Sequence, residues 1–242
     1  RKGTIMRLRS TVILSIAILC LATTAGWAQL TPYSQDFEAL GLPEEDPGAL
    51  ANDGWLVFAN AFKLPEGFYL YGYGPFPAPN GTGGFSEVRG ITGGPAQGSR
   101  AIVIYSDYNN GGHANGAQLI EANVFQEQWV ASEDVGNTWL FEFDARRALN
   151  GGIDLNSTAL AFFKTLDPNN GFALTNFITV DMTNVPDQWG SYRLSISIDA
   201  SLVGQILQFG FLNNATNYEP SAVLYDNVVF RREPVAVDFD VR

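Results

Sequence analysis

Cysteine and histidine are nearly absent from the sequence, which has one residue of each. Cys20 lies in an apolar N-terminal run that processing is predicted to remove, so the remaining chain would contain no thiol. This excludes disulfides, thiol catalysis and thiolate metal sites. His113 alone cannot form a multi-histidine metal site. The remaining chain of about 214 residues is long enough to bury a hydrophobic core without disulfides.

Basic residues are also scarce, with 14 Lys and Arg against 25 Asp and Glu. Four of the basic residues and none of the acidic ones lie in residues 1–28. The processed chain would therefore have 10 basic against 25 acidic residues, a net charge of −15. Such a surface repels phosphate backbones, which argues against nucleic acid as a partner, and it attracts cations such as calcium. The abundant Asn, Gln, Ser and Thr suit neutral hydrogen-bonding partners such as sugars.

Long hydrophobic runs are absent outside the N-terminus. The apolar run at 11–22 is followed by Gly26 and Ala28, small residues at positions −3 and −1 of a cleavage site, so residues 1–28 are predicted to be a secretory signal. Met6 is the expected initiator, with the upstream residues 1–5 untranslated. About 15 apolar residues are too few for a membrane span, the alternative interpretation. We expect a secreted, extracellular bacterial protein that has no membrane segment after cleavage.

No extended helical periodicity is present. Short runs of alternating apolar and polar residues recur instead, separated by clusters of Gly, Asn, Asp and Pro. The predicted strands are residues 31–40, 54–62, 99–106, 117–125, 138–146, 158–166, 177–182, 190–199, 205–212 and 223–230. About ten short strands predict an all-β fold, an antiparallel two-sheet β-sandwich (jelly roll), over residues 29–232. Residues 233–242 are expected to be a tail or an extra edge strand.

The strand at 138–146 shows how the two faces are assigned. Trp139, Phe141, Phe143 and Ala145 share one face, because side chains alternate along a strand. We expect this face to lie in the core and the opposite face to meet water or a ligand.

Several short motifs carry a resemblance to a known family. They are "DFE" at 36–38, Trp189 and Tyr192 at the start of a late strand, and "YDNV" at 225–228. In this order the segments resemble jelly-roll carbohydrate-binding modules attached to xylanases and cellulases, within the galactose-binding-like superfamily. The resemblance covers roughly residues 33–230. The same fold also resembles that of secreted surface proteins of environmental bacteria.

The resemblance implies a structural calcium ion. In such modules a front acidic pair meets an acidic residue of the last strand, and the corresponding residues here are Asp36, Glu38 and Asp226. Carboxylate and carbonyl oxygens are the ligands that calcium prefers. The alternative is that these acids cap strand ends and turns.

Three tyrosines alternate in "FYLYGYG", and they are the first candidate for ligand contact. Tyr69, Tyr71 and Tyr73 are spaced to share one strand face over about 13 Å, a row of rings suited to an extended glycan. Trp129, set among polar neighbours, is a second aromatic candidate. The alternative is that the tyrosines pack under a loop as a satellite core.

A long polar loop at 105–116 is the next candidate, because such loops often carry function. Its residues Asn109, Asn110 and His113 could hydrogen-bond sugar hydroxyls. The alternative is a solvated loop rich in turn residues.

Catalysis is the least supported interpretation. Glu142 and Asp144 share a strand face, as paired carboxylates of glycosidases can. However, Arg147 occupies the position where a jelly-roll glucanase would have a third acid.

The sequence thus predicts a secreted, non-catalytic protein that binds neutral polysaccharide or a cell-surface glycan through aromatic and amide side chains. The alternative is a structural or adhesive extracellular matrix protein that self-associates. A jelly-roll glycoside hydrolase or polysaccharide lyase ranks third.

Overall fold

The computed structural model describes residues 29–81, 83–148, 153 and 156–234. The predicted signal and residues 235–242 of the predicted tail lie outside this part of the chain.

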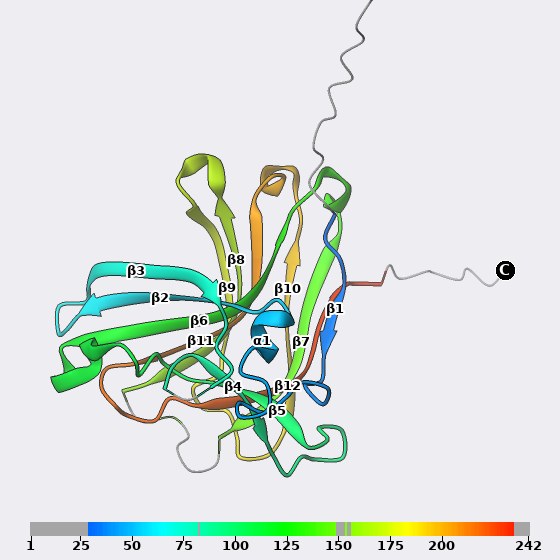
Figure 1. The fold of residues 1–242 in the computed structure, drawn as a ribbon. Helices are drawn as coiled ribbons and strands as arrows, with labels where there is room; N and C mark the ends of the chain where they lie inside the picture. The colour runs from blue at the N-terminus through cyan, green and yellow to red at the C-terminus, as the bar shows by residue number, and fades with distance from the viewer. Residues whose placement is uncertain (1–28, 82, 149–152, 154–155, 235–242) are drawn as a thin grey trace, which may run out of the picture.

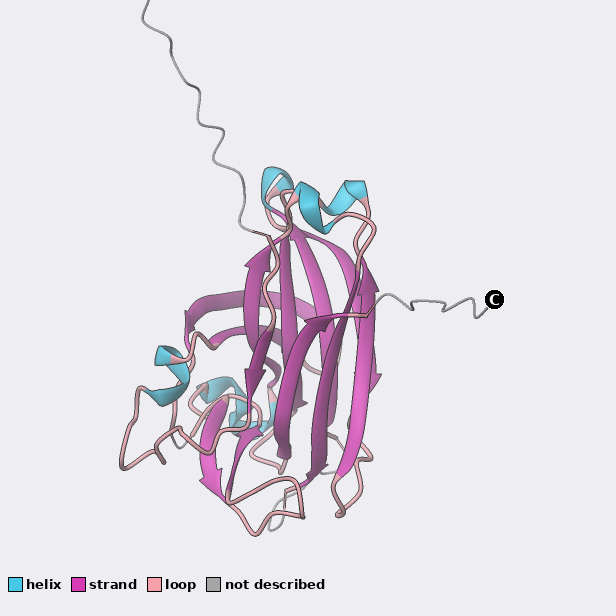
Figure 2. Cartoon of the chain, turned by 90° about the vertical axis from the view of Figure 1, so that its right-hand side faces the viewer, coloured by secondary structure: helices cyan, strands magenta, loops and turns pink. Residues whose placement is uncertain are grey.

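Two antiparallel sheets form the fold, one packed over the other (Figures 1 and 2). The first sheet has the strand order β10-β7-β12-β5-β4, with β1 also paired to β12. Its strands are β1 (Tyr33–Gln35), β4 (Ser86–Gly90), β5 (Arg100–Ile104), β7 (Thr138–Arg147), β10 (Gly190–Ser197) and β12 (Val223–Arg232). This confirms the predicted all-β, two-sheet jelly-roll sandwich.

The second sheet has the strand order β3-β2-β6-β11-β8-β9. Its strands are β2 (Leu56–Lys63), β3 (Phe68–Pro77), β6 (Gln118–Trp129), β8 (Thr158–Asp167), β9 (Ala173–Asp181) and β11 (Ile206–Ala215). Figure 1 shows this sheet curving strongly, from the β2–β3 hairpin at the left to the upright β8–β9 hairpin.

Helical segments are short and lie in the connections. They are α1 (Ala49–Asn52), η1 (Gly111–Gly116), η2 (Ser132–Asp134), η3 (Pro168–Asn170) and η4 (Ala200–Leu202). In the described part of the chain, no helix has the length and apolar composition needed to cross a membrane.

Aromatic side chains fill the space between the sheets. Phe141 of β7 lies at ring-centroid distances of 5.4 Å from both Phe209 and Phe211 of the facing strand β11. The predicted core face of β7 is confirmed, since Trp139, Phe141, Phe143 and Ala145 are all buried. Alternation therefore decides which residues meet at the centre.

The opening and closing segments of the chain lie side by side, as predicted. β1 pairs antiparallel with β12, with Tyr33 opposite Phe230. β1 is only three residues long, shorter than the predicted 31–40, because the chain turns away at Phe37, where φ is 60°. The strand β4 was not predicted.

A glycine permits the close approach of two central strands in the curved sheet. Gly210 of β11 lies opposite Phe125 of β6 and Phe162 of β8. A Cβ atom at this position would lie 2.2 Å from the carbonyl oxygen of Val124, which is backbone and cannot rotate away. The two strands therefore need glycine here to keep their spacing.

Replacing Gly210 by alanine is expected to lower the free energy of unfolding by about 1–3 kcal/mol or more, because backbone must shift to admit the methyl group. Urea unfolding of Gly210→Ala measures this loss. Gly90→Ala is the matched control, since a Cβ there meets nothing within 4 Å, and it should change stability by less than about 0.5 kcal/mol. Equal stability of the two variants would contradict the steric requirement.

Candidate functional site

A groove of about 700 Å³ lies on the outer face of the curved sheet, away from the aromatic core. Its polar lining residues come from four strands and are Asn60, Glu121, Asn123, Glu127, Lys164 and Gln208. Its apolar lining includes Phe58, Pro75, Phe125, Leu166, Phe172, Leu174, Phe177 and Ile206. The groove therefore combines hydrogen-bonding groups with exposed rings.

Alternation along the strands explains why these side chains point outward. Ile120, Ala122 and Val124 of β6 are buried in the core. The residues between and beyond them, including Glu121 and Asn123, consequently project from the opposite face.

The polar groups of the groove form hydrogen-bonded pairs across neighbouring strands. Glu121 Oε1 accepts from Asn60 Nδ2 at 3.0 Å and from Asn123 Nδ2 at 3.3 Å. Farther along the groove, Gln208 Nε2 donates to Glu127 Oε2 at 3.1 Å. These contacts hold the amide and carboxylate groups in place before any ligand arrives.

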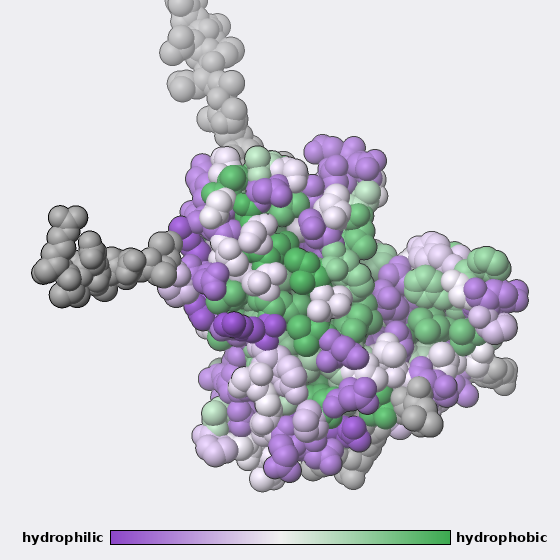
Figure 3. All heavy atoms as spheres, turned by 180° about the vertical axis from the view of Figure 1, so that it is seen from behind, coloured by the Kyte–Doolittle hydropathy of each residue, from purple (hydrophilic) through white to green (hydrophobic). Residues whose placement is uncertain are grey.

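The β8–β9 hairpin supplies an exposed apolar wall. Phe172, Leu174 and Phe177 are 59%, 53% and 45% exposed, unusually high for large apolar side chains lining one groove. Seen from behind, hydrophobic surface gathers at the middle of the molecule and on the projecting lobe to which the β2–β3 hairpin belongs (Figure 3).

Lys164 is the positively charged residue among those that line the groove. Its Nζ donates to Asn123 Oδ1 at 2.5 Å and lies 4.5 Å and 4.9 Å from the ring centroids of Phe162 and Phe177. Desolvation lowers the pKa of the Lys164 ammonium, and the negative charge of Glu121 opposes this shift.

The three predicted tyrosines do not share one face, so that prediction is wrong. Tyr71 pairs with Ala61 and Tyr73 with Ala59, on the core side of the sheet. A bulge shifts the register, so that Tyr69 lies opposite Phe62 and contacts its ring at 5.9 Å on the groove side. The extra residue in β3 reverses the side on which the next side chain lies.

Tyr69 lies close to the groove lining, because Gly72 leaves room for it. A Cβ atom at Gly72 would lie 2.7 Å from the Phe58 ring and 2.9 Å from the Tyr69 hydroxyl. Trp129, at the end of β6, lies opposite Ile206, which lines the groove. The structure thus places Tyr69 and Trp129 on the groove side.

Tyr71 and Tyr73 belong instead to a separate cluster with the predicted polar loop. The Tyr73 hydroxyl donates to Asp107 at 2.6 Å and accepts from Asn110 Nδ2 at 3.2 Å. Burial and the hydrogen bond to Asp107 raise the pKa of Tyr73. The Asn109 amide also donates to Asp107. Two predicted candidates, the tyrosine run and the loop, therefore meet through these contacts.

His113 is fully buried, which corrects its placement in an accessible loop. Its Nε2 contacts Ser106 Oγ at 3.1 Å, and its ring packs against Tyr108 and Tyr218. Desolvation lowers the pKa of His113 below its usual 6.5, with Asp107 and Glu219 opposing the shift. His113 is consequently a neutral packing residue that a saccharide cannot reach.

This burial predicts a pH dependence of stability. The unfolded chain binds a proton at His113 more readily than the folded chain does, so the stability contributed by neutral His113 is complete above about pH 6.5 and is lost as the pH falls. Urea unfolding at about pH 7.5 and about pH 5 should show a smaller acid loss in His113→Gln than in the unsubstituted protein. Subtracting the acid-induced loss of unfolding free energy in one protein from that in the other removes the contributions of the other titratable groups. Equal losses in the two proteins would contradict the expectation.

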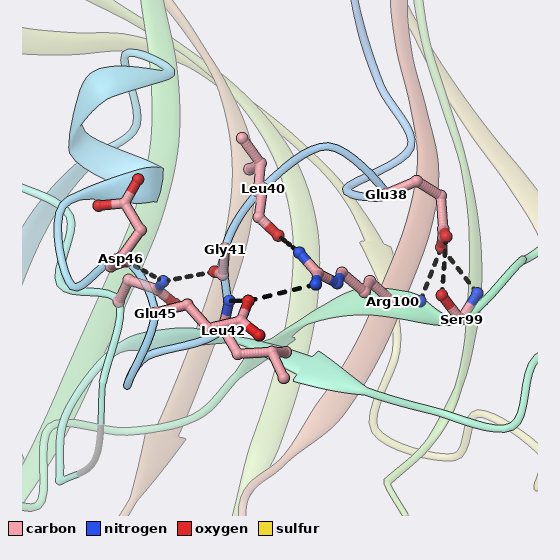
Figure 4. Close-up of polar contacts among 9 residues, drawn as sticks. Glu38, Leu40, Gly41, Leu42, Glu45, Asp46, Ser99 and Arg100 are labelled. Carbon is pink, nitrogen blue, oxygen red and sulfur yellow. Dashed lines mark hydrogen bonds and ion pairs between the residues drawn. The ribbon is translucent and has the colours of Figure 1, made fainter.

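The acids predicted to bind calcium are near one another but are partly engaged. Glu38 accepts from the Arg100 amide at 2.7 Å, the Ser99 amide at 2.7 Å and Ser99 Oγ at 2.8 Å (Figure 4). The Arg100 amide is the main cause of the lowered pKa of Glu38. Asp36 Oδ1 accepts from the Glu38 amide at 3.2 Å.

Asp226 differs from these acids because it is fully buried and its Oδ2 has no hydrogen-bond partner in the described structure. Desolvation, with the charges of Glu38, Asp144 and Asp36, raises the pKa of Asp226 to about 7. Within the residues described, no three His, Cys, Asp or Glu side chains are grouped to hold a metal ion. Carbonyl and water oxygens would have to complete a calcium site.

The paired carboxylates of β7 have structural partners. Glu142 accepts from Arg231 Nε at 2.7 Å, and Asp144 accepts from Gln97, Ser191 and Asn227. Glu142 is therefore paired with Arg231 of the neighbouring strand β12, a partner that alternation within β7 could not predict.

The groove residues themselves were not predicted. Alternation in β6 and β8 would have placed Glu121, Asn123 and Lys164 outward. It could not show that β2, β6, β11, β8 and β9 are neighbours in one sheet, since strand order is not encoded locally.

No protein-family model and no curated protein matches the sequence. Solved structures do match. The enzymatically active domain of bacteriophage CBA120 tailspike protein 4 is 10% identical over 82% of this chain and 22% of that chain, with a TM-score of 0.46. A second match is the structure of the CBM22-1–GH10 modules of Clostridium thermocellum endo-1,4-beta-D-xylanase 10B complexed with xylohexaose. It is 11% identical over 76% of this chain and 27% of that chain, with a TM-score of 0.38.

A cyclase from Fischerella sp. TAU is 13% identical over 86% of this chain and 100% of that chain, with a TM-score of 0.44. A chain that contains a carbohydrate-binding module is among these similar structures. The present chain spans about a quarter or less of the tailspike and xylanase chains. At these identities the likeness concerns the fold alone.

Proposed function

We propose that this protein is a secreted, non-catalytic carbohydrate-binding protein that holds a saccharide in the groove of the curved sheet. The observation that supports this proposal most is the pairing of an exposed aromatic wall with fixed amide and carboxylate groups in one groove. Sugars present both kinds of surface, apolar C–H faces and hydroxyl edges.

The apolar wall accounts for binding of the sugar face. The rings of Phe172 and Phe177 are exposed on one side of the groove, and Phe58 lines it on the strand β2. Aromatic rings offer an electron-rich face to C–H groups, and their burial by a ligand removes apolar surface from water.

The polar groups account for binding of hydroxyls. Asn60, Asn123 and Gln208 can each donate and accept, while Glu121 and Glu127 accept. Because they are already hydrogen-bonded to one another, little side-chain entropy is lost when a sugar binds.

Loss of the aromatic wall should weaken binding. We expect Phe172→Ala/Phe177→Ala to lower the affinity for soluble xylan or glucan about tenfold, measured by retardation in polysaccharide-containing gels and by calorimetry with oligosaccharides. Phe68→Ala is the matched control, because Phe68 is 65% exposed on the β2–β3 hairpin and does not line the groove. The proposal fails if the wall variant and the control bind equally well.

A matrix protein is the second candidate. Exposed Phe68, Tyr69 and Leu70 on the β2–β3 hairpin favour it, since exposed apolar clusters mark interaction surfaces. Assembly that increases with protein concentration, in the absence of any glycan, would support this candidate over saccharide binding.

We also propose a structural calcium ion beside Asp226. The buried, unpartnered Oδ2 of Asp226 and the nearby charges of Asp36 and Glu38 support this proposal. A divalent cation would offset the desolvation and the carboxylate repulsion that together raise the Asp226 pKa, and would link the first and last segments of the chain.

Millimolar calcium should raise the melting temperature by several degrees, and a chelator should reverse the rise, because a ligand that binds only the folded state stabilises it. Asp226→Asn should abolish the response. Asp187→Asn, which changes an exposed acid in the β9–β10 connection, should retain it. An unchanged melting temperature in calcium would rule the site out.

A further inference from the structure

Lys164 has an unusual position for a charged side chain. The side chain is half-buried, and its ammonium lies close to two phenyl rings of the sheet, those of Phe162 and Phe177. In the described part of the chain, no carboxylate lies within 4.0 Å of Nζ, and Asn123 Oδ1 is its hydrogen-bond acceptor. Lysine is rarely buried without a charged partner.

The two carboxylates of the groove are hydrogen-bonded to amides, and only the charge of Glu121 acts on the Lys164 ammonium, from beyond ion-pair distance. Glu121 accepts from the amides of Asn60 and Asn123, and Glu127 accepts from Gln208. Nζ has three N–H groups to donate, so it can take further acceptors from a ligand.

We infer that Lys164 makes the groove selective for an acidic sugar, with a uronate carboxylate pairing with Nζ. This inference rests on the proposed function and deepens it. The strand register supplies the other contacts. Phe177, Lys164, Gln208 and Glu127 lie directly opposite one another across β9, β8, β11 and β6.

This row matches the chemistry of one uronate residue. Phe177 presents a ring to the sugar face and Lys164 presents a cation to the carboxylate. Gln208 and Glu127 present acceptors and donors to the hydroxyls at the other end. A carboxylate receives charge-assisted hydrogen bonds that a neutral hydroxymethyl group does not.

The overall charge limits the ligand further. The chain has a net charge of −11, which would become −15 after the predicted processing, and this charge repels polyanions. One acidic side group on an otherwise neutral chain pairs with Lys164 and meets less of this repulsion than a polyanion does, although Glu121 and Glu127 also line the groove. The expected ligand is therefore a neutral backbone that carries isolated uronates.

Calorimetry with two xylo-oligosaccharides of equal length tests the inference. One of the two carries a single glucuronic acid side group. We expect about tenfold tighter binding of the acidic ligand, decreasing with added salt. In Lys164→Met the ratio of the two affinities should fall to about one, whereas Lys164→Arg, which retains the charge, should keep a preference.

Equal affinities in the unsubstituted protein would overturn the inference while leaving the proposed function intact. Binding of neither oligosaccharide would instead contradict the proposed function. Free glucuronate and benzoate form a third arm. If benzoate binds as tightly as the acidic oligosaccharide, the groove selects carboxylates in general and the assignment to a sugar is wrong.

Stability without ligand provides an independent readout. Because a half-buried ammonium without a carboxylate in ion-pair contact is unfavourable, Lys164→Met should raise the melting temperature of the free protein. Lys63→Met, which changes an exposed lysine of the neighbouring hairpin, is the control and should not. A lower melting temperature for Lys164→Met would show that the chain itself satisfies the ammonium, which contradicts the inference.

Discussion

The close approach of β6 and β11 at Gly210 is the constraint on which the groove depends. Without a side chain at that position, the carbonyl of Val124 can approach β11, and Phe125 and Phe162 of the flanking strands pack over the gap. The sheet curves (Figure 1), and its inner-face side chains, such as Val124 and Phe211, are buried in the core. The groove lies on the outer face of this curved sheet.

The same strands serve two purposes because their side chains alternate. In β11, Phe209 and Phe211 pack in the core, while Gln208 faces the groove. A substitution in the groove therefore leaves the aromatic core in place, and the rigid core holds the groove side chains in fixed positions. Binding groups on strands are positioned more tightly than groups on loops, which favours a preorganised site.

Lys164 and Asp226 are two places where the described structure leaves a charge incompletely compensated. Lys164 lies among rings on the outer face, and Asp226 lies buried beside the pairing of β1 with β12. An uncompensated charge lowers the stability of the free chain, but a ligand or an ion of opposite charge can compensate it. Folded proteins keep such groups at binding sites, where binding and not stability is the requirement. We propose an anion for the first site and a cation for the second.

The sequence by itself determined most of the strands and the faces of regular strands such as β7, because alternation is a local property. It identified the buried side of β7, and the resemblance in its motifs indicated the pairing of the first and last segments. Tertiary structure decided the rest. A one-residue bulge separated Tyr69 from Tyr71 and Tyr73, and packing buried His113. The groove arose from strand order in a curved sheet, which brings together residues that are distant along the chain and carry no local signal of their proximity.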